Sequence, residues 1–116
     1  MRGEDLTFGA TVRRSREELE IGLREMAKKI GVSPTYLSKI ERDMIPPPAE
    51  DKVIAIGNLL GLDSDELLAL AGKVSSDLTE IIRKKPREMA SFLRATRELT
   101  SDQIARLAEE ARKERD

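Results

Sequence analysis

The stretch KKIGVSPTYLSKIERD, residues 28–43, places two short helical patterns on either side of a tight turn. Gly31 can adopt the positive φ that a sharp turn between helices requires. Ser33 is a good N-cap residue, because its hydroxyl can accept a hydrogen bond from a backbone N–H of the following turn. Pro34 suits the first helical position, where its missing N–H is not needed. The stretch therefore predicts one helix that ends near Gly31 and a second that begins at Pro34.

The second of these helices is expected to bury Leu37 and Ile40, which leaves a small, polar and basic surface on its outer side. That surface consists of Thr35, Ser38, Lys39 and Arg42. Such a helix fits the major groove of B-DNA, where base edges offer hydrogen-bond donors and acceptors. Five basic and two acidic residues lie between Leu23 and Arg42, although the whole chain carries a net charge of −1. A local excess of this kind attracts a polyanion, but an ordinary solvated helix surface would carry the same charges.

The composition excludes several classes of site. The 116 residues include no cysteine and no histidine, which rules out disulfides, thiolate or histidine metal sites and catalysis by a Cys–His or Ser–His pair. No carboxylate pair lies in an evident apolar cleft and no glycine-rich phosphate loop is present, so we expect no enzyme, catalytic residue, metal or cofactor. No apolar run approaches the ~20 residues that a membrane span needs. We therefore expect no membrane partner. The missing cysteine fits a reducing cytosol, and binding to DNA would make the expected cytoplasmic protein nucleoid-associated.

Every segment with a clear hydrophobic period has the period of a helix, and none alternates like a strand. The stripes are Phe8, Val12, Ser15 and Leu19; Leu23, Met26, Ala27 and Ile30; and Val53, Ile56, Gly57 and Leu60. A later helix is expected to start at Asp63 with Glu66 in a pattern that resembles a capping box, and to stop at Gly72. Residues 1–72 are therefore predicted to form an all-α domain of five helices.

Residues 73–116 are predicted to form about three further amphipathic helices. Pro86 suits the first turn of the middle helix, and Thr100 with Gln103 makes a capping box for the last. This region has too little apolar mass for a core of its own, so a second copy or the first domain must cover it. The expected dimerisation residues are Met89, Phe92, Leu93, Ile104, Leu107 and Ala108. The alternative is a monomer in which these residues fold back on Leu67, Leu68 and Leu70.

The segments VRRSREELEIGLREMAKKIGVSPTYLSKIERD, residues 12–43, and PPPAEDKVIAIGNLLGLDSDELLAL, residues 46–70, together resemble the Cro and phage-repressor type of helix-turn-helix protein, also called the XRE family. The resemblance spans about residues 6–71. It implies a five-helix, lambda-repressor-like DNA-binding domain whose second and third helices form the helix-turn-helix. It also implies a transcription regulator, in the first place a repressor, that binds a palindromic operator in double-stranded DNA as a homodimer through the major groove.

The resemblance also implies which residues contact DNA. The base-reading positions of the family correspond to Pro34, Thr35, Ser38 and Lys39. The phosphate-binding positions correspond to Ser33, Tyr36, Arg42, Lys28 and Lys29. Simpler interpretations remain: Tyr36 also suits the edge of the core, and Lys39 also suits a phosphate contact or a plain surface position. Thr35 and Ser38 are small enough to read bases, or merely to fit the groove.

Members of the family often pair an arginine late in the first helix with a glutamate at the end of the third, and Arg16 and Glu41 occupy those places. Arg16 is therefore expected to form this structural ion pair, with a phosphate contact as the alternative. The chain departs from the family at three positions. Leu23 stands where the family often has a phosphate-binding glutamine, and Glu20 and Asp43 stand where it usually has glycine.

A protein-binding regulator on the same fold is the alternative function. Such a protein, an antitoxin for example, would engage a toxin or an inactivating protease through its helical tail. A third helix that docks on protein is expected to carry large apolar residues on its outer face. The threonine, serine and lysine found there favour DNA.

Overall fold

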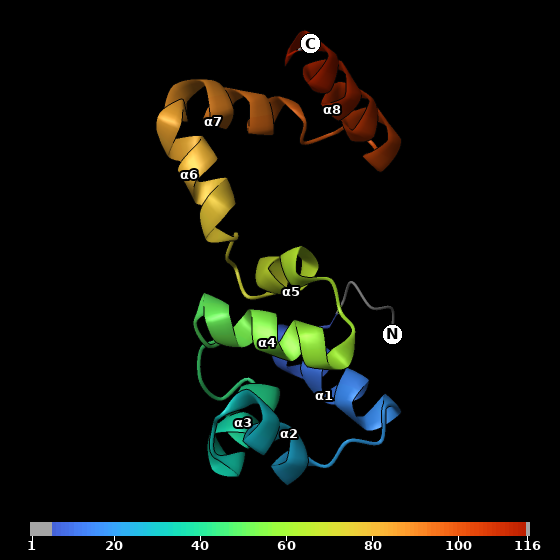
Figure 1. Ribbon diagram of the computed structural model, residues 1–116, viewed down its shortest axis with the longest axis vertical. Coiled ribbons are helices and arrows are strands. Elements are labelled where there is room, and N and C mark those ends of the chain that lie inside the picture. The colour runs from blue at the N-terminus through green and yellow to red at the C-terminus, as the bar shows by residue number, and fades with distance from the viewer. Residues whose placement is uncertain (1–5, 116) are drawn as a thin grey trace. The chain divides into compact units, whose positions relative to one another are not determined.

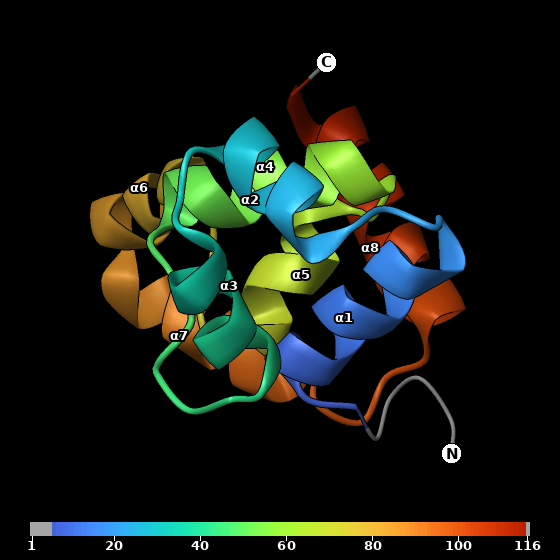
Figure 2. The same cartoon turned by 90° about the horizontal axis from the view of Figure 1, so that it is seen from below.

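The computed structural model describes residues 6–115, in which the chain forms eight helices and no strand (Figures 1 and 2). The helices are α1 (Phe8–Glu18), α2 (Leu23–Ile30), α3 (Pro34–Glu41), α4 (Glu50–Leu60), α5 (Ser64–Leu70), α6 (Ser76–Lys84), α7 (Pro86–Ala95) and α8 (Ser101–Arg115). They fall into two compact units, Met1–Ser75 and Ser76–Asp116. The predicted all-α class, with five helices followed by three, is confirmed. Within residues 6–115, no helix combines the length and the apolar character needed to cross a bilayer.

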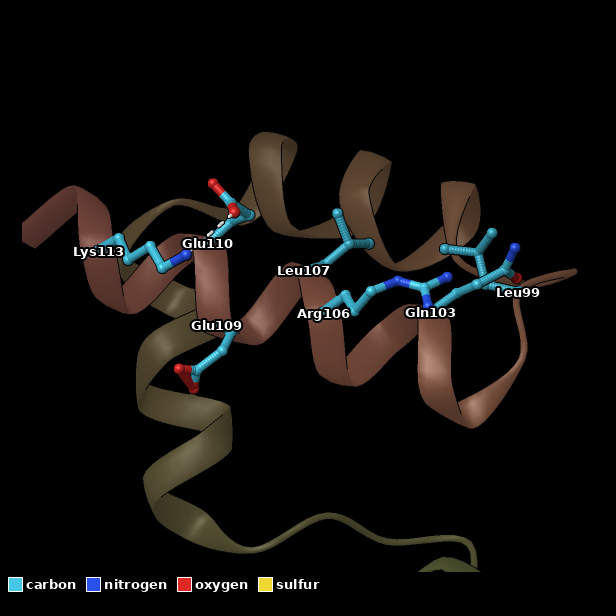
Figure 3. Close-up of a pocket in the computed structure, with 7 residues that line it drawn as sticks. All are labelled: Leu99, Gln103, Arg106, Leu107, Glu109, Glu110 and Lys113. Carbon is cyan, nitrogen blue, oxygen red and sulfur yellow. Dashed lines mark ion pairs between the residues drawn. The ribbon is translucent and has the colours of Figure 1, made fainter.

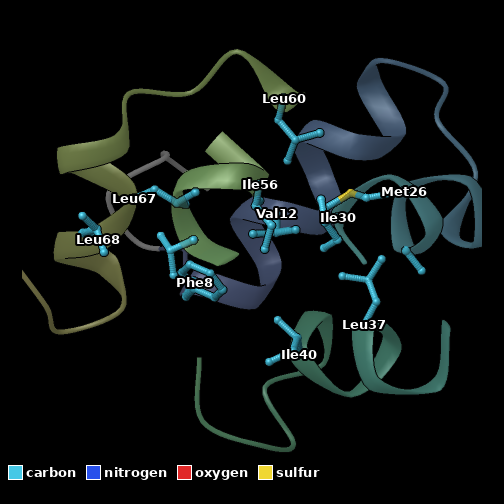
Figure 4. Close-up of a cluster of buried hydrophobic side chains, with 12 residues drawn as sticks. Phe8, Val12, Met26, Ile30, Leu37, Ile40, Ile56, Leu60, Leu67 and Leu68 are labelled. Atoms are coloured by element: carbon cyan, nitrogen blue, oxygen red, sulfur yellow. The ribbon is translucent and has the colours of Figure 1, made fainter. Parts of the chain in front are cut away.

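One hydrophobic core joins the five helices of the first unit (Figure 4). Its buried side chains are Phe8, Val12, Met26, Ala27, Ile30, Leu37, Ile40, Val53, Ile56, Leu60, Leu67 and Leu68. The predicted stripes supply most of these positions, but the placement of Leu19 in the core was wrong. Leu19 follows the last residue of α1 as its C-cap and is 52% exposed. The buried position after Val12 is Arg16, one turn further along α1.

The helix ends form as the sequence predicts. Gly31 ends α2 in the left-handed region with φ of 77°. The Ser33 hydroxyl accepts a hydrogen bond from the Tyr36 N–H at 3.0 Å, and Pro34 occupies the first turn of α3. These contacts satisfy backbone groups that a helix end leaves unpaired.

The two caps expected later in the chain are also present. Asp63 accepts from the Glu66 N–H at 3.0 Å at the start of α5. At the start of α8, the Thr100 hydroxyl accepts from the Gln103 N–H at 3.1 Å, and the Gln103 side chain accepts from the Thr100 N–H at 2.8 Å. The second pair is a complete capping box.

Two of the departures from the family adopt the backbone conformation that favours glycine. Glu20 has φ of 58° and Asp43 has φ of 57°. The Asp43 carboxylate accepts hydrogen bonds from the Gly9 N–H at 3.0 Å and from the Thr7 hydroxyl. It thus ties the chain after α3 to the first turn of α1, where a negative charge is favourable. These contacts offset the cost of about 1–2 kcal/mol that a side chain incurs in this conformation.

The crossing of α1 over α3 leaves no room for a side chain at Gly9. A Cβ atom there would lie 2.3 Å from the Ile40 carbonyl oxygen and 2.8 Å from that of Glu41. Both neighbours are backbone atoms, which cannot rotate away as a flexible side chain does. The absence of a side chain at Gly9 therefore sets how closely α1 approaches the end of α3.

Replacing Gly9 by alanine is expected to lower the free energy of unfolding by about 3 kcal/mol, the upper end of the usual cost of overpacking. Gly22→Ala is the matched control, because no atom lies within 4 Å of the position of its Cβ. We expect the control to cost no more than about 1 kcal/mol, the typical cost of alanine at an N-cap. Urea denaturation of the full chain measures both, and a Gly9→Ala protein as stable as the control would contradict the close packing of α1 on α3.

Candidate nucleic-acid interface

The outer side of α3 presents the four predicted base-reading residues. Thr35 and Lys39 are exposed, and Pro34 and Ser38 are half-buried. The opposite side of the helix buries Leu37 and Ile40 in the core, as their spacing predicts. The packing of these apolar side chains therefore fixes which side of α3 faces outward.

The predicted phosphate-binding residues lie at the ends of α2 and α3. Lys28 and Lys29 are exposed in the last turn of α2, and Arg42 is exposed as the C-cap of α3. The Arg42 Nε donates a hydrogen bond to the Ser38 carbonyl at 3.3 Å. Ser33 is exposed while its hydroxyl caps α3. Tyr36 is half-buried and packs against the core.

A buried ion pair joins α1 to the end of α3. The Arg16 Nε and Nη2 donate to the two carboxylate oxygens of Glu41 at 2.8 and 3.0 Å, and its Nη1 donates to the Ile21 carbonyl at 2.8 Å. The two side chains are only 11% and 3% exposed. The hydrogen bond to Glu41 raises the pKa of the Arg16 guanidinium above its ordinary value. In the structure Arg16 thus forms the expected ion pair, with three of its donors satisfied inside the protein.

Two hollows lie beside the outer side of α3, and they share Leu23, Ser38 and Arg42. The first has a volume of about 430 Å³ and is lined by Arg13, Arg16, Leu23, Ser38, Glu41 and Arg42. The second has a volume of about 300 Å³ and is lined by Leu23, Arg24, Pro34, Thr35, Ser38 and Arg42. Together they bring three predicted base-reading residues and Arg42 to one surface. Lys39 and the other predicted phosphate-binding residues line neither hollow.

Arg13 and Arg24 line these hollows but are not among the residues predicted to contact DNA. A positional signal existed for Arg13, because it lies three residues before Arg16 and residues three apart share a helix face. Arg24 is one of the five basic residues between Leu23 and Arg42, and it directly follows Leu23 at the start of α2.

The second unit exposes most of its predicted dimerisation residues. Phe92, Leu93, Ile104 and Leu107 are 39–49% exposed. Ala108 is exposed, while Met89 is half-buried. Leu107 and Leu99 line a hollow of about 520 Å³ along α8, which is bordered by basic and acidic side chains (Figure 3). The bordering residues are Gln103, Arg106, Glu109, Glu110 and Lys113.

Residues 7–70 match a family model described as a helix-turn-helix domain. Two uncharacterised HTH-type transcriptional regulators from strains of Mycobacterium tuberculosis are each 32% identical to the chain over 75 residues. The match covers 65% of this chain and 53% of each relative, so the chain spans about half the length of these curated relatives.

Solved structures resemble the chain as well. The complex of the SinR and SinI proteins matches with a TM-score of 0.51 at 22% identity, over 94% of this chain and 98% of the solved chain, and it shows the same fold. SinR, from Bacillus subtilis, has also been solved in complex with DNA. That structure matches with a TM-score of 0.49 at 31% identity, over 53% of this chain and 98% of the solved one.

Replacing Glu41 by alanine is expected to lower the free energy of unfolding by about 3–5 kcal/mol, because it leaves the buried Arg16 charge without its partner. Glu18→Ala is the control, since Glu18 forms an exposed pair with Arg14 at 3.5 Å on the same helix as Arg16. Exposed pairs contribute about 0–1 kcal/mol, so the control should unfold close to the parent. Thermal and urea unfolding measure both variants. If both lose the same free energy of unfolding, the buried pair contributes no more to stability than the exposed one.

Proposed function

This chain belongs to the helix-turn-helix domain family, of the Cro and phage-repressor type, and we propose that it is a sequence-specific DNA-binding transcription regulator. We propose further that it acts as a repressor, that residues 1–72 bind the major groove of double-stranded DNA and that residues 73–116 join two copies into a homodimer. The family match also supports the prediction that the chain is not an enzyme. With DNA as the ligand, we propose a cytoplasmic, nucleoid-associated protein.

The outer side of α3 is the main support for this proposal. A helix that reads base edges needs small polar or basic side chains on a rigid support, because large apolar groups would leave base donors and acceptors unpaired. Thr35, Ser38 and Lys39 meet the first condition, and Pro34 is small. The second is met because Leu37 and Ile40 anchor α3 in the core from behind. We assign base contacts to the four outer residues and phosphate contacts to Ser33, Tyr36, Arg42, Lys28 and Lys29.

Selection of bound sites from a pool of random duplexes tests the function directly, and we expect it to return a palindrome.

On the selected site, Lys39→Ala is expected to lose about 1–3 kcal/mol of binding free energy and to relax the preference at one base pair. Arg42→Ala is expected to weaken binding about equally on all sequences, with a salt slope shallower by about one unit. If Lys39→Ala changes neither affinity nor preference, the assigned reading face is wrong, and a pool without enrichment would reject sequence-specific binding.

The exposed apolar side chains of the second unit support a homodimer. Leu107, Ile104 and Phe92 keep much of their surface in water within one chain, and burying such a side chain contributes about 1.5–3 kcal/mol. Pairing also multiplies DNA affinity, because the second half-site is bound at a high effective concentration. A two-fold dimer would place its reading helices about one DNA turn, roughly 34 Å, apart.

Leu107→Gln is expected to weaken the dimer at least a hundredfold, because a symmetric interface loses two apolar side chains, about 3–6 kcal/mol in all. Glutamine keeps a good helix propensity, so α8 should still form. Arg115→Gln, an exposed position at the end of α8, is the control. Sedimentation equilibrium of the full chain measures both. A parent protein that stays monomeric at tens of micromolar, with or without DNA, would rule out the proposed role of the second unit.

A protein partner on this same surface is the second candidate. The apolar hollow beside Leu107 would suit an amphipathic helix of a toxin or an inactivating protease as well as another copy (Figure 3). The same sedimentation experiment separates the two candidates. A monomeric parent that still binds its operator would favour a partner protein over self-association.

A further inference from the structure

A second set of phosphate contacts follows from the two hollows beside α3. At the start of α2 the helix has no side-chain cap, and the Leu23 side chain can donate no hydrogen bond to a phosphate. Leu23 nevertheless lines both hollows, with arginines on either side. We infer that Arg13 and Arg24 bind backbone phosphates of duplex DNA on the two sides of Leu23. This inference rests on the proposed function and adds to it one contact from α1 and one from α2.

The first hollow has a positive charge that the protein does not neutralise. It contains three guanidinium groups and one carboxylate, that of Glu41. Both oxygens of this carboxylate accept hydrogen bonds from Arg16. Arg13 and Arg42 therefore have no carboxylate partner among the lining residues of the hollow. The Arg13 Nε lies 3.4 Å from a Glu17 oxygen, but both side chains are 55% exposed, so this pair is weak and easily exchanged for a phosphate. Arg42 uses its Nε on the Ser38 carbonyl, while a guanidinium carries five N–H donors.

The second hollow connects this charge to the reading face. It is lined by Arg24 and Arg42 and by the first residues of α3, Pro34 and Thr35, with no carboxylate among its lining residues. A DNA strand that brings base edges to Thr35 therefore passes beside Arg24. Arginine binds phosphate with two parallel hydrogen bonds, which positions the duplex without reading its sequence.

The chain contains a matched control for Arg13. Arg14 is its neighbour on α1 and forms an equivalent pair with Glu18 at 3.5 Å, with similar exposure. Arg14 lines neither hollow. Arg13→Gln and Arg14→Gln thus remove the same charge and the same kind of surface pair. Because both variants lose one positive charge, any difference between them in DNA binding comes from the position of that charge and not from the change in net charge.

The test measures binding of the full-length Arg13→Gln, Arg24→Gln and Arg14→Gln proteins to a labelled duplex of mixed sequence over a range of sodium chloride concentrations. Each lost phosphate contact makes the slope of log Kobs against log salt shallower by about 0.9. We expect this change for Arg13→Gln and for Arg24→Gln. The double variant that carries both substitutions should show about twice the change, and Arg14→Gln should keep the parental slope. Equal urea midpoints of the parent and the four variants exclude a folding defect.

The outcomes separate this inference from the proposed function. If the parent protein binds no duplex at low salt, both the proposed function and the two phosphate contacts are rejected. If the parent binds but Arg13→Gln and Arg24→Gln behave like Arg14→Gln, the two contacts are rejected and the proposed function stands. Melting in inorganic phosphate, compared with chloride at equal ionic strength, identifies a free-anion site instead. A rise in Tm for the parent that is lost in Arg13→Gln, together with a parental salt slope for Arg13→Gln on DNA, would overturn the assignment to DNA.

Discussion

The buried pair of Arg16 and Glu41 is the interaction on which the geometry of the first unit depends. Two charges with side chains 11% and 3% exposed lose most of their hydration, and only good hydrogen-bond geometry compensates for that loss. The pair meets this requirement with two hydrogen bonds, and a third from Arg16 to the Ile21 carbonyl fixes the chain that leads into α2. One guanidinium thereby sets the relative position of α1, the start of α2 and the end of α3.

Other contacts hold the helix-turn-helix from the remaining sides. The absence of a side chain at Gly9 allows α1 to meet the backbone at the end of α3, and the Asp43 carboxylate binds the Gly9 N–H at that crossing. On the far end of α2, the Lys52 ammonium donates to the Ile30 carbonyl at 2.9 Å and places a positive charge at a helix C-terminus, where it is favourable. Polar contacts to backbone groups thus position α2 and α3 together with the apolar core.

The distribution of charged residues over the surface explains how a chain with a net charge of −1 can suit DNA. Glu41 is buried against Arg16, so its charge is balanced by Arg16 and not by the exposed Lys39 and Arg42 of the outer side of α3. Arg42 and Arg24 are exposed around the hollows. Association with a polyanion depends on such a local surface more than on the total charge.

The sequence by itself determined the helices and their order, because helical periodicity, the Ser33 cap, Gly31 and the Thr100–Gln103 box are local signals. It also determined which side of α3 faces outward, since Leu37 and Ile40 define the buried side. Only the tertiary structure exposed Leu19, because Arg16, which meets Glu41 across 25 residues, takes the buried position after Val12. Only the tertiary structure brought Arg13 and Arg24 to hollows shared with α3, since residues on three helices become neighbours through packing and not through sequence spacing.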